Sequence, residues 1–336
     1  MEFAEYSDSE FRSRFIEILR DKMGKNNTYK FALARFLLEH SRDSTSVIVT
    51  YQNIADCFFK YYWLQECKSR LRQGPKNQNP KIITIIRKEF PNKTYPLKFD
   101  DMCIKYHEKV ERCRKQIAAV CRKDVIHRFQ SVNGLEEKMF YDYFAKHHHT
   151  SGNATTDPHG GILLNVNAME FLKENFAPLY KSTILEWIRF IERRNLGVPN
   201  LVKKIEGIVD GPRNQAKYRN VLTPFEPDCF YCGYRLDSKK THVDHVLPFD
   251  YIADTNLWNL VLACQKCNCE KLGHLPPEYY IDKLINRNHM HKNDIRGLEK
   301  SLDTLNFDSH DISRHYSNAK DYGYVVLKKF PKNRKR

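Results

Sequence analysis

One stretch decides the fold of this chain: CFYCGYRLDSKKTHVDHVLPFDYIADTNLWNLVLACQKCN, residues 229–268. Two Cys-x-x-Cys pairs frame it, Cys229 with Cys232 and Cys264 with Cys267, and 31 residues separate the pairs. Each pair supplies two of the four thiolates of a tetrahedron, so together they predict a closed structural zinc site. Such a site has no open coordination position, and its Zn2+ stabilises the fold without taking part in a reaction. Four reduced core cysteines are the alternative, but apolar burial gives no reason for two paired spacings.

Candidate catalytic and metal-binding residues lie inside this frame. Asp244 and His245 are adjacent on a β-prone segment, and Asn268 directly follows the last cysteine of the frame. A histidine with an ordinary pKa of about 6.5 can accept a proton from water at neutral pH, so His245 is a candidate general base. Asp244 and Asn268 offer oxygen ligands, which suit a hard cation such as Mg2+ better than zinc. The sequence therefore predicts a second, catalytic metal next to the structural one.

The pattern CxxC…DHxxP…NLxxxCxxCN resembles the HNH endonucleases, also called ββα-metal nucleases. The resemblance is specific over residues 229–271 and looser as far as residue 280. It implies that His245 activates the attacking water and that Asp244 and Asn268 bind one catalytic Mg2+ or Mn2+. Many members of the family have histidine where this chain has Asn268, which remains a neutral ligand.

Two further positions take their roles from the same resemblance. Asn259 matches the middle letter of the motif, whose side chain braces the loop that carries the base. Capping of a helix that begins at Asn259 is a second, compatible interpretation. Lys271 matches a commonly basic position and is expected to contact a phosphate. Cys269 does not continue the paired spacing and is interpreted as a packed thiol.

Around this window the chain reads as an α+β protein of three regions. We expect a mainly helical region over 1–210 for target recognition or DNA binding, an HNH module over 215–280, and a helical, basic extension over 281–336. A polar segment at 146–161 predicts a surface loop or an internal boundary, and its histidines (His147, His148 and His149) read as solvated. Apolar residues recur at helical spacing over 10–23, 28–38, 51–63, 101–129, 167–175 and 182–194.

The net charge favours a polyanionic partner. The formal charge is +15 and the pI is near 9.2. Residues 215–280 carry about −1, whereas residues 1–214 carry +10 and residues 281–336 carry +6. The phosphate contacts that dominate nucleic-acid affinity are therefore expected on the flanks. The candidates are Lys68, Arg70, Arg72, Lys76, Lys81, Lys328, Lys329, Lys332, Arg334, Lys335 and Arg336.

The amino-terminal sequence and the hydropathy predict a cytoplasmic protein. Acidic residues stand near the start, where a signal peptide carries basic ones, and no apolar run approaches the roughly 20 residues that a membrane span needs. Mean hydropathy is −0.65. No contact with a membrane is expected.

Together these features predict a metal-dependent endonuclease that hydrolyses DNA and leaves 5′-phosphate and 3′-hydroxyl ends, as the family does. By analogy, the large extra region suggests a restriction or anti-phage enzyme acting on double-stranded DNA. Two scissile strands make a homodimer plausible. One alternative is a non-catalytic zinc module that binds nucleic acid, and another is an HNH nuclease acting on RNA or branched DNA.

Overall fold

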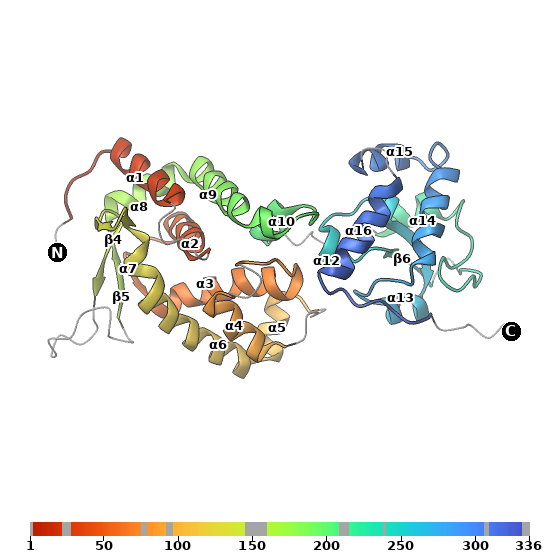
Figure 1. The fold of residues 1–336 in the computed structure, drawn as a ribbon, viewed down its shortest axis with the longest axis horizontal. Coiled ribbons are helices and arrows are strands. Elements are labelled where there is room, and N and C mark those ends of the chain that lie inside the picture. The colour runs from red at the N-terminus through yellow and green to blue at the C-terminus, as the bar shows by residue number, and fades with distance from the viewer. Residues whose placement is uncertain are drawn as a thin grey trace. The chain divides into compact units, whose positions relative to one another are not determined.

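The computed structural model describes residues 3–21, 28–74, 79–91, 97–144, 160–207, 215–237, 240–305 and 309–330. The chain divides into two compact units (Figure 1). One comprises Met1–Leu196 with Lys204–Gly207, and the other comprises Gly197–Lys203 with Ile208–Arg336. Helices predominate and the sheets are small and antiparallel, so the α+β class expected from the sequence is confirmed.

The first unit is mainly helical, because its apolar residues recur at helical spacing. Its helices begin at good N-caps where the sequence offers them: Ser7 forms a capping box with Glu10, and Thr50 forms one with Asn53. The α-helices from the amino terminus up to residue 206 are α1 (Asp8–Arg20), α2 (Tyr29–Asp43), α3 (Tyr51–Trp63), α4 (Lys81–Glu89), α5 (Phe99–Lys105), α6 (His107–Val120), α7 (Ile126–Phe129), α8 (Val166–Glu174), α9 (Phe176–Ile191) and α10 (Leu201–Glu206). A 3-10 turn, Glu192–Arg194, extends α9.

The single helix predicted over 101–129 is interrupted. Tyr106 has φ −118° and ψ 36°, which ends α5 before α6 begins at His107. A π-helical turn, Cys121–Val125, then separates α6 from α7, and a similar turn, Leu64–Lys68, extends α3. Hydrophobic spacing does not detect such breaks, because the apolar face continues across them.

A three-stranded antiparallel sheet lies in the same unit, in the order β1 (Ile48–Thr50), β5 (Gly161–Leu164), β4 (Tyr141–Phe144). β4 and β5 flank the polar segment at 146–161, most of which lies outside the described residues. Because these strands pair directly, the chain on both sides of the segment belongs to one unit, and a domain boundary there is wrong. Gly161 is required for the close pairing with β1, since a Cβ there would lie 2.0 Å from the carbonyl oxygen of Val49. A short hairpin pairs β2 (Ser131–Val132) with β3 (Leu135–Glu136).

The second unit contains the ββα element that the motif predicts. β6 (Thr241–His245) pairs antiparallel with β7 (Leu260–Cys264), and α13 (Gln265–Lys271) follows at once. The prediction of a helix that begins at Asn259 is wrong. Asn259 ends a 3-10 turn, Leu257–Asn259, and the chain continues into a strand. The buried apolar run of β7 fits a buried helix or a buried strand equally well by pattern alone, and pairing with β6 decides between them.

The carboxyl-terminal region shares one core with the ββα element. This core includes Leu222, Tyr251, Leu284 and Phe330, and it joins α11 (Gln215–Leu222), α12 (Phe249–Ile252), α14 (Tyr279–Met290), α15 (Leu298–Leu302) and α16 (Ser309–Asp321). A 3-10 turn, Asp303–Leu305, follows α15. Near the end of the described chain, Leu275 N donates to Val325 O (2.9 Å) and Leu327 N donates to Leu275 O (2.9 Å). The extension predicted over 281–336 therefore completes the module rather than following it.

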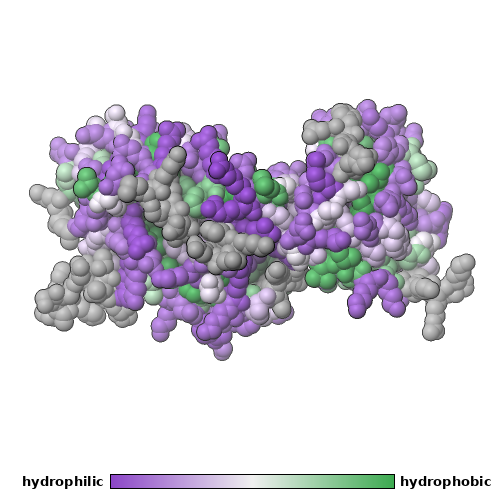
Figure 2. All heavy atoms as spheres, in the orientation of Figure 1, coloured by the Kyte–Doolittle hydropathy of each residue, from purple (hydrophilic) through white to green (hydrophobic). Residues whose placement is uncertain are grey.

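The surface fits the polar composition. Figure 2 shows hydrophilic side chains over most of the face that it draws. Within the described part of the chain, no helix combines the length and the apolar character that crossing a membrane requires.

Candidate metal centre and catalytic residues

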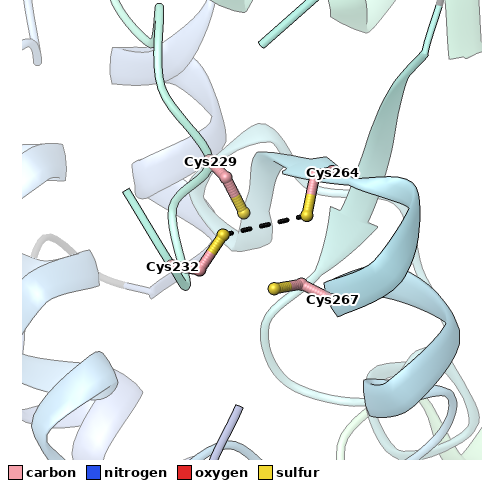
Figure 3. A group of neighbouring side chains, drawn as sticks. All are labelled: Cys229, Cys232, Cys264 and Cys267. Carbon is pink, nitrogen blue, oxygen red and sulfur yellow. Dashed lines mark hydrogen bonds between the residues drawn. The ribbon is translucent and has the colours of Figure 1, made fainter. Parts of the chain in front are cut away.

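The four paired cysteines converge in the second unit (Figure 3). Cys264 ends β7 and Cys267 lies in the first turn of α13, while Cys229 and Cys232 lie in a turn before β6. Their ligand atoms all lie within 4.8 Å of one another, and the Sγ atoms of Cys232 and Cys264 are 3.8 Å apart. Tetrahedral Zn–S bonds of about 2.3 Å place neighbouring sulfurs about 3.8 Å apart. The donor set and its spacing therefore fit Zn2+.

Local backbone geometry prepares this site. Gly233 adopts φ 68°, and its N–H donates to Cys229 O (2.9 Å), which closes the first Cys-x-x-Cys turn. Burial raises the pKa of the Cys229 thiol to about 11, so the thiolate that binds zinc needs the charge of the cation. Cys269, interpreted from the sequence as a packed thiol, is instead exposed and lies outside the four-sulfur group.

Two buried groups hold the carboxylate of Asp244. The Tyr231 hydroxyl donates to Asp244 Oδ2 at 2.5 Å, and Lys271 Nζ lies 3.3 Å from the same oxygen. Burial raises the pKa of Tyr231 well above its ordinary value, and the charge of Asp244 adds to this rise, so the phenol remains a donor. Burial lowers the pKa of Lys271, and the charge of Asp244 opposes that shift. A carboxylate held in this way has a defined orientation.

Lys271 corrects an expectation from the sequence. Its side chain is fully buried, and Nζ donates to the carbonyl oxygen of His245 (2.5 Å) as well as pairing with Asp244. An ammonium group at this depth is not presented to a phosphate. Lys271 therefore links α13 to the end of β6. This strand carries both Asp244 and His245.

Asn268 lies on the same helix as Lys271 and is half-buried. It precedes Lys271 by three residues, so both occupy one face of α13. Because Lys271 reaches Asp244, this face of the helix is the one turned towards the carboxylate. The fold thus places the two oxygen donors predicted from the sequence, Asp244 and Asn268, on adjoining elements.

Asn259 holds the loop that follows His245. Its amide oxygen accepts from Leu247 N (2.7 Å) and its amide nitrogen donates to Leu247 O (2.9 Å), while the Asn259 carbonyl accepts from Val246 N (2.9 Å). The side chain is completely buried. His245 is itself buried, at the end of β6, and its ring packs edge-on against Phe249 with 5.4 Å between centroids. Asn259 therefore ties the turn before β7 to the loop after His245 and does not cap a helix.

The edge of β7 that faces away from β6 is held by charged side chains that the sequence pattern did not predict. Leu262 N donates to Glu226 (2.7 Å), Arg287 Nε lies 3.3 Å from the other oxygen of Glu226, and Arg287 also donates to Leu260 O. Burial raises the pKa of Glu226 and lowers that of Arg287, and each is opposed by the charge of the other. No sequence spacing connects Glu226 with Arg287, so the pattern does not predict their pairing. Nor does it predict that Tyr231, inside a Cys-x-x-Cys pair, donates to Asp244.

The residues predicted on the flanks to contact phosphates differ in burial and pairing. Arg70 is buried, and Lys81 pairs with Asp124 at 2.7 Å. Among the other candidates that the structure describes, Lys68 is half-buried, whereas Arg72, Lys328 and Lys329 are exposed. The following residues fall outside the described part of the chain: Lys76, Lys332, Arg334, Lys335, Arg336, His147, His148 and His149.

Comparison with known proteins agrees with this geometry. Residues 229–277 match the HNH endonuclease family, and they contain the four-cysteine cluster that fits zinc. Among solved structures, the type II-C Cas9 enzyme from Actinomyces naeslundii is similar at 11% sequence identity and a TM-score of 0.21. That alignment covers 95% of this chain and 42% of the Cas9 chain, so this protein spans less than half of that enzyme's length. No curated protein matches the chain.

Proposed function

We propose that this protein is a metal-dependent endonuclease that hydrolyses DNA phosphodiester bonds and leaves 5′-phosphate and 3′-hydroxyl ends. The match of residues 229–277 to the HNH endonuclease family carries the proposal. The brace of Asn259 on the loop after His245 and the two buried partners of Asp244 support it. A module that only bound zinc and nucleic acid would need neither arrangement.

His245 is the general base in this proposal. It accepts a proton from the water that attacks the phosphorus, a role that histidine commonly fills as a general base. Lys271 holds the backbone carbonyl of His245, and Asn259 holds the next turn of the loop at Leu247. The backbone from the His245 carbonyl to Leu247 is thereby fixed, which keeps the base in one position during attack.

Asp244 and Asn268 would hold the catalytic cation, Mg2+ or Mn2+. A carboxylate and an amide oxygen are the donor chemistry that hard cations prefer. Tyr231 and Lys271 both occupy Oδ2 of Asp244, so Oδ1 is the oxygen offered to a cation. The chemistry that such a cation supplies when bound is stabilisation of negative charge on the phosphate and on the leaving 3′-oxygen.

The biological setting forms the finer part of the proposal. The first unit is a separate compact body, and residues 1–214 carry a net charge of +10, which suits contact with a polyanion and selection of a target. We assign the protein to restriction or anti-phage defence in the cytoplasm, acting on double-stranded DNA, with a homodimer serving two-strand cleavage.

Plasmid nicking in the presence of Mg2+ or Mn2+ tests this function. His245→Ala is expected to lower the cleavage rate by at least about 100-fold, because it removes the general base. His242→Ala, on the same strand but half-buried, is the matched control and should retain activity. Equal inactivity of wild type and His245→Ala on modified, unmodified, branched and single-stranded DNA and on RNA would favour the non-catalytic zinc module. Cleavage confined to RNA or branched DNA would replace the proposed substrate.

A further inference from the structure

A basic pocket of about 450 Å3 lies in the second unit. Three exposed cationic side chains line it: Lys217 from α11, and Arg296 and Lys300 from the segment that includes α15. The remaining wall includes Thr255 and Asn256, which lie between His245 and Asn259 in the motif. Residues that are 83 positions apart in sequence thus contribute positive charge to one cavity.

The charged side chains in the described lining of this pocket are all basic. None of the described residues that line it is Asp or Glu. Of the acids adjacent in sequence to the lining residues, Asp254 lies 3.0 Å from Lys203 and Glu299 lies 3.7 Å from Lys292, while Asp303 is exposed and is not among the lining residues. Three like charges around one cavity repel one another, and an anion that enters it relieves this repulsion.

The wall of the pocket is tied to the proposed catalytic loop. The Ser301 hydroxyl accepts from Trp258 N (3.1 Å), and the Thr304 hydroxyl accepts from Trp258 Nε1 (3.1 Å). Trp258 is buried and directly precedes Asn259, the residue that braces the loop after His245. Hydroxyl, ammonium and guanidinium groups are the side chains that contact phosphate oxygens in nucleic-acid complexes.

We propose that this pocket binds the phosphodiester backbone of the nucleic acid that the module cleaves. The inference rests on the proposed function, because it identifies where that substrate is held. Lys217, Arg296 and Lys300 contact phosphate oxygens, and the link through Trp258 keeps this contact in register with the loop of His245. The module therefore holds its substrate with its own residues, although residues 215–280 alone have almost no net charge.

Binding to a DNA duplex tests this pocket. The inactive His245→Ala chain serves as background, so that cleavage does not interfere. The triple variant Lys217→Gln, Arg296→Gln and Lys300→Gln is expected to raise Kd and to reduce the slope of log K against log salt by about 1 for each phosphate that the protein no longer neutralises. The control removes three exposed cations of the same unit, with Arg235→Gln, Lys240→Gln and Lys320→Gln. It has the same net charge and should keep the wild-type slope.

The outcomes separate this inference from the proposed function. Equal slopes for the pocket variant and the control, with thermal melting showing both folded, would overturn the pocket, whatever nicking assays show. A reduced slope in the pocket variant alone supports it, even if the wild-type chain fails to nick DNA and the proposed function falls. With active enzyme, the pocket variant should raise KM and leave kcat within a few-fold, since these residues hold substrate away from the reacting atoms.

Discussion

Oδ2 of Asp244 accepts a hydrogen bond from the Tyr231 phenol and pairs with the Lys271 ammonium group. All three side chains are buried. A charged hydrogen bond in such surroundings is short and directional. The same ammonium group holds the carbonyl of His245, so one lysine orients the proposed ligand and the proposed base together. Positioning of this kind costs little during reaction, because the groups are already in place when substrate arrives.

Tyr231→Phe tests the first of these contacts. Loss of the hydroxyl removes one hydrogen bond to a buried carboxylate, so the free energy of unfolding should fall by about 2 kcal/mol in urea denaturation. Metal-dependent nicking should fall about tenfold, because Asp244 loses one of its two constraints. Tyr234→Phe, at an exposed tyrosine three residues later, should change neither value. A Tyr231→Phe enzyme with wild-type metal dependence would show that the hydroxyl has no positioning role.

At the scale of elements, β7 is held on both edges. β6 satisfies one edge, and Glu226 and Arg287 contact backbone groups of β7 on its other side. Asn288 donates to the carbonyl of Trp258, in the 3-10 turn that precedes β7. α14 carries both Arg287 and Asn288, and its Lys283 donates to Phe230 O. A two-stranded hairpin is marginal by itself, and these side-chain contacts explain how so small a sheet supports a site.

The buried carboxyl of Glu226 predicts a pH dependence. Its pKa is raised above the ordinary 4.5 by burial, so the folded chain holds the proton more tightly than the unfolded chain. Its contribution to stability is complete below pH 4.5 and is lost as pH rises through the raised pKa. In urea unfolding from about pH 4 to pH 7, the stability of wild type relative to Glu226→Gln should therefore decrease with pH. A constant difference would contradict the raised pKa, and pH-dependent loss of zinc cancels in this comparison.

The cysteine cluster joins the turn at Cys229–Cys232 to β7 and α13. Cys232→Ser should therefore lower zinc content and unfold the module together, as measured by metal analysis and thermal melting. Asp244→Asn should keep one zinc per chain and lose metal-dependent nicking. Both substitutions remove the charge that faces Lys271, but alanine at 244 is the poorer test, since it also removes the oxygen that accepts from Tyr231 and leaves two buried donors unsatisfied. An Asp244→Asn chain without zinc would contradict the two separate sites.

At the scale of the whole molecule, the end of the described chain reaches the metal centre. The Phe330 ring stacks on Tyr231 with 4.2 Å between centroids and 15° between planes, and it packs edge-on against Tyr280. The tyrosine that holds Asp244 is therefore itself held by a residue 99 positions further along the chain. The basic segment after α16 is in this respect part of the module.

Phe330→Ala should lower the free energy of unfolding by about 3 kcal/mol, since it removes a large buried ring from the core, and should weaken nicking through Tyr231. Lys329→Ala, at the exposed neighbour, should leave thermal melting unchanged. Equal melting temperatures for the two variants would show that the stacking contributes nothing. Any truncation that probes the basic tail must retain Phe330.

The sequence by itself determined the local features of this protein. It determined the four-cysteine cluster and the ββα element, because each depends on residue types at short, fixed spacings around one motif. It also determined most helices of the first unit, through apolar periodicity. Only the tertiary structure decided that Lys271 is buried, that Asn259 leads into a strand, and that the carboxyl-terminal region completes the core. These depend on contacts between residues distant in sequence, where burial and charge pairing outweigh local pattern.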